Sequence, residues 1–202
     1  YVNITGNGNY TGIIKKEIEV KQSTLLLELS FNANQSKEYN KNPLVNGSDF
    51  IITVKGNSLV LGISDYNLII DEITRAQGGT YNNSLDNVID AGTYTIKFHV
   101  EKDGYQSSDT QSLTYVISQR TIGITWTNLE FTYDGNTKVP TATAINLCTG
   151  DDCTITVTGE QVNANVNGTT YTATADTLSN SNYKLPNNKT RTFKINPFKI
   201  KL

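Results

Sequence analysis

A single pattern, two strand-like runs around a turn rich in Gly, Asn and Tyr, occurs three times and constrains this chain more than any other feature. The copies begin at Tyr1, Tyr94 and Tyr171. Their turns, in the same order, are residues 6–10, 102–105 and 179–183. Strand-like runs joined by such turns fold as β-hairpins. A hairpin recurring at the end of each unit predicts a tandem-repeat chain.

The second copy shows the alternation of a half-buried strand. From Tyr94 to Val100, large apolar side chains alternate with polar ones, so that each kind occupies one face. No stretch carries the 3.6-residue apolar period of a helix. We therefore expect an elongated all-β chain of tandem units, with further strands near residues 25–31, 50–54, 66–73, 122–126 and 154–157.

The repeats also divide the chain. A tyrosine follows the first strand-like run of each complete unit, at Tyr39 and at Tyr133. We expect residues 1–22 to be the terminal hairpin of a truncated preceding repeat, followed by sandwiches at 23–119 and 120–202. A two-stranded hairpin is marginal in isolation, so the first segment is expected to dock on the first full unit or on a neighbouring chain.

Residues 90–94, Asp-Ala-Gly-Thr-Tyr, resemble the motif that opens the sixth strand of immunoglobulin-like sandwiches. In those folds the tyrosine forms a tyrosine corner, in which its hydroxyl bonds back to nearby backbone. The resemblance implies tandem immunoglobulin-like β-sandwiches, arranged as an elongated chain. It gives the structural role of the corner to Tyr94, and to Tyr171 through a looser copy of the motif. Ile96 and Ala173 stand where antibody domains carry a cysteine, so the core disulfide of antibodies is absent.

Several segments of the last unit are similar to the bacterial immunoglobulin-like repeats called MBG domains. They are Tyr-Asp-Gly at 133–135, the run 168–175, Asn-Tyr at 182–183 and Phe-Lys-Ile-Asn-Pro at 193–197. Residues 1–20 are similar as well, whereas 23–119 matches only through its ends and departs from the pattern over 48–85. The resemblance implies arrays on bacterial surface proteins, with a spacer or adhesive role and no catalytic residue.

Two cysteines, Cys148 and Cys153, enclose the turn Thr-Gly-Asp-Asp. The spacing favours a hairpin disulfide. A metal site and free thiols are the alternatives, and zinc would need further ligands. A disulfide would indicate an oxidising compartment, and so short a loop would stabilise the fold by only about 2 kcal/mol.

Charge and composition exclude several classes of function. The net charge is −2, with 17 basic and 19 acidic residues, which is not the basic face of a nucleic-acid-binding protein. No apolar run approaches the ~20 residues of a membrane span, so we expect no direct membrane insertion in this fragment.

The residues that carry chemistry are sparse. His99 is the only histidine and is expected on the solvent face of its strand. Asp151 and Asp152 are better explained as turn formers than as calcium ligands, which come in sets of six to eight oxygens. Trp126 is expected in the core or at a module interface. We expect no catalytic, cofactor or metal site and no enzyme activity.

Two functions remain. Short connections at 20–25 and 117–122 favour a semi-rigid spacer in a cell-surface or secreted protein, with adjacent repeats as partners. The alternative is an adhesive module whose loops bind a glycan or a host matrix protein.

Overall fold

The computed structural model describes residues 2–5, 13–16, 25–79, 81–166 and 168–200. Its elements are strands and one 3-10 turn, η1 (Leu85–Asn87). The predicted terminal hairpin is present as β1 (Val2–Thr5) paired antiparallel with β2 (Ile13–Lys16). Its docking depends on residues outside the described part and stays a prediction.

The first module, residues 25–119, has two sheets. Its four-stranded sheet has the order β4-β9-β8-β7, and β4 runs parallel to β9. Its second sheet has the order β3-β5-β6. The strands are β3 (Leu27–Phe31), β4 (Asn34–Glu38), β5 (Ile52–Gly56), β6 (Leu59–Val60), β7 (Asn67–Arg75), β8 (Gly92–Glu101) and β9 (Gln111–Ser118). The sheets pack face to face, because the ring of Phe98 on β8 meets Phe31 and Phe50 edge-on at 5.3 and 5.2 Å.

The second module, residues 120–200, repeats this arrangement. Its four-stranded sheet has the order β12-β17-β15-β14, and β12 again runs parallel to the last strand, β17. A second pair is β11-β13, and β10 pairs in parallel with β16. The strands are β10 (Arg120–Thr121), β11 (Gly123–Thr127), β12 (Glu130–Thr132), β13 (Thr141–Ile145), β14 (Ile155–Thr158), β15 (Tyr171–Leu178), β16 (Tyr183–Lys184) and β17 (Thr190–Asn196). The all-β prediction is confirmed, and both modules are compatible with immunoglobulin-like sandwiches.

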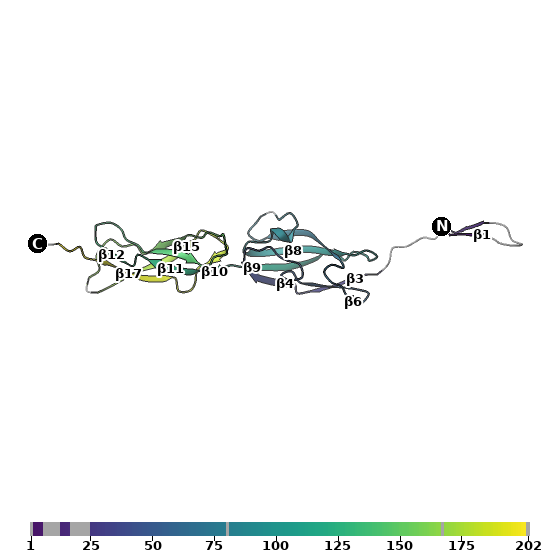
Figure 1. Ribbon diagram of the computed structural model, residues 1–202, viewed down its shortest axis with the longest axis horizontal. Helices are drawn as coiled ribbons and strands as arrows, with labels where there is room; N and C mark the ends of the chain where they lie inside the picture. Colours follow the sequence, from purple (N-terminus) through teal and green to yellow (C-terminus); the bar gives the residue numbers. More distant parts are fainter. Residues whose placement is uncertain (1, 6–12, 17–24, 80, 167, 201–202) are drawn as a thin grey trace.

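The two modules lie end to end along the long axis of the molecule (Figure 1). One buried apolar cluster runs through the first module and continues into the near end of the second, where it includes Ile122, Cys153 and Tyr183. The far end of the second module has a separate, smaller core of Ala173, Phe193 and Ile195. One apolar core therefore spans the boundary between the modules.

Candidate functional site

The predicted structural tyrosines both bond back to the backbone. Tyr94 is fully buried, and its hydroxyl donates to the carbonyl oxygen of Asp90 at 2.7 Å, which is the geometry of a tyrosine corner. The Tyr171 hydroxyl, in contrast, reaches eight residues back to the carbonyl oxygen of Asn163 at 3.0 Å and is exposed. The second module, whose sequence matches the corner motif less closely, thus has a tyrosine that bonds to a carbonyl eight residues away and not four.

This difference gives a test by substitution. Tyr94→Phe is expected to lower the free energy of unfolding by about 1–2 kcal/mol, because it removes the part-buried hydrogen bond from a fully buried tyrosine to the Asp90 carbonyl. Tyr171→Phe is the matched control. It should lower the free energy of unfolding by less, since water can replace the lost donor. Urea unfolding of both variants measures the difference, and equal losses would contradict the corner assignment.

The remaining predicted residues lie apart from these tyrosines. Trp126 on β11 is half-buried and packs against the small core of the second module. His99 on β8 points to the solvent side, where its Nδ1 lies 2.8 Å from a carboxylate oxygen of Asp71. The hydrogen bond to Asp71 raises the pKa of His99 above its ordinary value, against a smaller opposing effect of burial.

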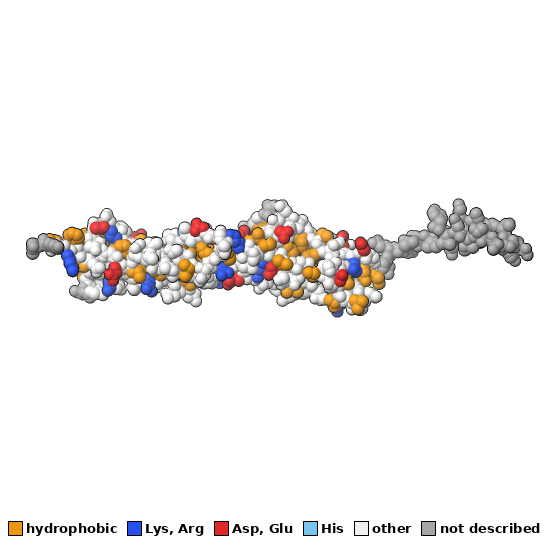
Figure 2. Space-filling model, viewed as in Figure 1, with side chains coloured by type: hydrophobic (Ala, Val, Ile, Leu, Met, Phe, Trp, Pro, Cys, Tyr) orange, Lys and Arg blue, Asp and Glu red, His pale blue; other side chains and the backbone are white. Residues whose placement is uncertain are grey.

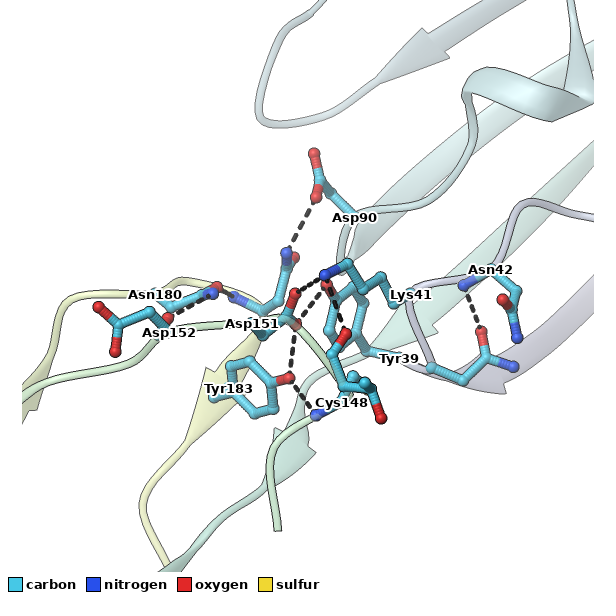
Figure 3. Close-up of polar contacts among 12 residues, drawn as sticks. Tyr39, Lys41, Asn42, Asp90, Cys148, Asp151, Asp152, Asn180 and Tyr183 are labelled. Carbon is cyan, nitrogen blue, oxygen red and sulfur yellow. Dashed lines mark hydrogen bonds and ion pairs between the residues drawn. The ribbon is translucent and has the colours of Figure 1, made fainter. Parts of the chain in front are cut away.

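A polar cluster that the sequence did not predict joins the two modules (Figure 3). We call it the joint: Tyr39 and Lys41 from the first module, and Cys148, Asp151 and Tyr183 from the second. The Asp151 side chain is 8% exposed. Its Oδ2 accepts hydrogen bonds from the hydroxyls of Tyr39 at 2.9 Å and Tyr183 at 2.6 Å. One carboxylate therefore holds a tyrosine from each module.

The two tyrosine rings also touch. Tyr39 and Tyr183 are 3% and 2% exposed, and their rings meet edge to face with centroids 5.4 Å apart. The Tyr183 hydroxyl accepts the backbone N–H of Cys148 at 2.9 Å while it donates to Asp151. Aromatic pairs in this geometry contribute about 0.5–1.5 kcal/mol beyond the area that they bury.

Lys41 adds an ion pair across the boundary. Its Nζ lies 2.7 Å from Oδ1 of Asp151 and donates to the carbonyl oxygen of Thr149 at 3.1 Å. The lysine backbone has a φ of 66°, in the left-handed region that favours glycine. Because the Lys41 side chain is 42% exposed, the pair is screened by water and its own contribution is at most about 1 kcal/mol.

These contacts set the ionisation of the joint. Burial alone would raise the pKa of the Asp151 carboxyl, but hydrogen bonds from Lys41, Tyr183 and Tyr39 outweigh it and lower that pKa below its ordinary value. Burial, together with the hydrogen bond to Asp151, raises the pKa of Tyr39 to about 12. The same two causes raise the pKa of Tyr183. At neutral pH the joint is one carboxylate held by neutral hydroxyls.

A second group of contacts lies beside the joint. The Asn182 amide donates to Oδ1 of Asp90 at 2.9 Å and accepts the backbone N–H of Ala91 at 2.8 Å. The connecting residue Gln119 donates through its amide to the carbonyl oxygens of Ser181 and Tyr183. The motif that supplies the tyrosine corner thus also contacts the next module.

The sequence contained partial evidence for this site. Tyr39 and Tyr183 each belong to a motif that recurs along the chain. Asp151 was interpreted as a turn former, and its backbone N–H does close a turn on the carbonyl oxygen of Cys148 at 3.0 Å. The contact between residues 39, 151 and 183 depends on how the modules meet, which no local pattern encodes.

The cysteines flank Asp151. Cys148 is half-buried and Cys153 is buried, and both thiols are free here, so the disulfide stays a prediction. Treatment with glutathione disulfide is expected to yield a chain lighter by two hydrogens and stabilised by about 2 kcal/mol, measured by mass spectrometry and urea unfolding. Cys148→Ser is the control that cannot form the bond. A wild type that keeps both thiols would contradict the prediction.

Within the described residues, nowhere do three or more His, Cys, Asp or Glu side chains gather in a way that could hold a metal ion. In the same part of the chain, no helix has the length and apolar character of a membrane span.

Comparison with known proteins identifies a family. The MBG domain family matches residues 74–121 and 123–197, which is more than half of the chain. Neither the curated proteins nor the solved structures gave a match. The two matched segments meet close to the boundary between the modules and cover strands β8 and β9 of the first and β10 to β17 of the second. The chain belongs to the MBG domain family.

Proposed function

We propose that this chain is a semi-rigid spacer in a cell-surface or secreted protein, without enzyme activity, whose partners are the repeats on either side of it. A spacer must resist bending where its modules meet. The observation that carries the proposal is the joint, in which Asp151 holds Tyr39 of one module and Tyr183 of the other. An apolar core that continues through the same boundary supports it.

The surface of the first module agrees with this proposal. A binding face for glycans would expose aromatic rings. Tyr66 and Tyr81, the aromatic residues between 60 and 90, are both buried. On the face drawn in Figure 2, charges of both signs are interspersed among polar and apolar side chains, with no single-sign charged patch among the described residues.

Residual dipolar couplings of the whole chain test the spacer. If the joint is stiff, couplings from both modules fit a single alignment tensor, and a variant with a flexible Gly-Ser insert between Gln119 and Arg120 requires two. Two independent tensors in the unmodified chain would refute the proposal. Small-angle scattering provides an independent check, because the insert should broaden the distribution of maximum dimensions.

One observation favours an adhesive function as the alternative. A groove of about 750 Å³ lies mostly within the part of the first module that departs from the family pattern. Val45, Ile63 and Ile69 line it with exposed aliphatic side chains. Screening the whole chain on glycan and matrix-protein arrays tests this function. Binding that Ile63→Asp abolishes, and that Val162→Asp in the second module leaves intact, would favour the adhesin.

A further inference from the structure

The far end of the second module repeats the backbone of the joint. In the first module, the backbone N–H of Tyr39 donates to the carbonyl oxygen of Ser118, the last residue of β9, at 2.9 Å. In the second module, the N–H of Tyr133 donates to the carbonyl oxygen of Asn196, the last residue of β17, at 2.8 Å. The two tyrosines therefore occupy the same position in their modules.

The turns after these tyrosines also agree. Lys41 and Gly135, each two residues past its tyrosine, have φ values of 66° and 82°. In both turns the side chain before this residue accepts a hydrogen bond from the backbone N–H after it, at 3.0 and 2.9 Å. The second module thus carries a preformed copy of the turn that the first module contributes to the joint.

The copies differ in what covers them. Tyr39 is 3% exposed beneath Tyr183, whereas Tyr133 is 39% exposed. The same contrast holds in the segments that follow the last strands. Ile122, four residues past Ser118, is 3% exposed, whereas Ile200, four residues past Asn196, is 80% exposed. Nearby, Val166 and Phe198 are each 66% exposed. Apolar side chains gathered at one end of a module mark an interaction surface.

We propose that this end, formed by Tyr133, Gly135, Val166 and Phe198, is a docking surface for the near end of a further MBG-type module. The inference rests on the proposed spacer function and assigns the surface through which the following repeat would dock. The incoming module would place a turn tyrosine, the equivalent of Tyr183, edge-on against Tyr133. Glycine at position 135 removes the ion pair that Lys41 supplies in the existing joint, so this second joint relies on the aromatic contact.

Tyrosine nitration by tetranitromethane tests the proposal. The chain is extended by a copy of residues 125–202 joined directly after Leu202, because Leu202 is the equivalent of Ile124. We call Tyr133 of the original module the inner Tyr133 and that of the copy the outer Tyr133. Thr137→Ser in the copy gives the peptide with the outer Tyr133 a different mass. Nitration of the inner Tyr133 should slow about tenfold, in line with the 39% and 3% exposure of Tyr133 and Tyr39. The outer Tyr133 should react as it does in the parent chain.

Two control variants distinguish docking of the copy on Tyr133 from the mere attachment of a second module. A flexible Gly-Ser spacer before the copy should return the inner Tyr133 to the parent rate, whereas Gly135→Lys should protect it further through an ion pair with Asp151 of the copy. Equal nitration of inner and outer Tyr133 would overturn the proposal. A second extended chain, with residues 29–119 after Leu202, repeats the test should the first copy not fold.

Different results would refute the spacer and the docking surface. Tyr39 reports the existing joint in every one of these chains, and its nitration at the rate of an exposed tyrosine would refute the spacer. Rapid nitration of the inner Tyr133 alone, with Tyr39 protected, would refute only the docking surface.

Discussion

Replacing Asp151 with alanine is expected to lower the free energy of unfolding by about 2–3 kcal/mol and to loosen the two modules, because hydrogen bonds to a buried charged group are among the strongest. The substitution removes the acceptor of both Tyr39 and Tyr183 and leaves two nearly buried hydroxyls without it. Urea unfolding measures the energetic loss. Residual dipolar couplings should then require a separate alignment tensor for each module.

Asp152→Ala is the matched control, since that neighbouring side chain is exposed and its residue contributes only a backbone carbonyl to Asn180. It should change stability by less than about 0.5 kcal/mol, as surface substitutions do. If Asp151→Ala proved equally mild, or if the modules kept one tensor without it, the joint would not be the element that stiffens the chain.

The same carboxylate predicts the response to acid. The folded-state pKa of Asp151 is lowered, so its contribution is fully present above the pKa of the carboxyl in the unfolded chain, about 3.9. That contribution is lost as the pH falls through the lower, folded-state value. The difference in unfolding free energy between wild type and Asp151→Asn should therefore shrink below about pH 4. A difference that stayed constant down to pH 2 would contradict the hydrogen-bonded carboxylate.

The strands that could be predicted are those with a strong period of two. Along β8, alternate residues from Tyr94 to Val100 are fully buried, as expected. By contrast, β4 (Asn34–Glu38) was not predicted, because it is a polar edge strand paired only with β9 and carries no large apolar side chain. β13 (Thr141–Ile145) was missed for a related reason, since its Thr and Ala side chains give a weak alternation. Edge position and small side chains conceal a strand from local patterns.

The joint could be predicted only in part, because its residues come from two modules. Local sequence identified Tyr183 as a recurring turn residue, yet its equivalent Tyr105 closes the same turn, with N–H to carbonyl distances of 3.1 Å at Tyr105 and 3.2 Å at Tyr183. The two tyrosines differ in the residue that each ring contacts. Tyr183 contacts Tyr39 of the other module, whereas Tyr105 contacts Gly56 of its own module. A neighbour in another module is set by the packing at the boundary, which depends on many residues at once.

Tyr183→Ala is expected to have the largest effect of the changes considered, about 3–5 kcal/mol, because it removes a buried aromatic ring and leaves a cavity. The ring lies against Tyr39, and the hydroxyl holds both Asp151 and the Cys148 backbone. Urea unfolding measures the loss, and Tyr183→Phe separates the hydroxyl, worth about 1–2 kcal/mol, from the ring.

The matched control for this change is Tyr105→Ala, at the equivalent turn of the first module, where the half-buried ring covers Gly56. It should cost clearly less than Tyr183→Ala, because no tyrosine of another module packs against it within the described residues. A double-mutant cycle between Tyr39 and Tyr183 should give a coupling of about 0.5–1.5 kcal/mol from the rings. Equal losses at both turns, with no coupling, would mean that each tyrosine stabilises only its own module, and the stiffness of the chain would then have to come from the shared apolar core alone.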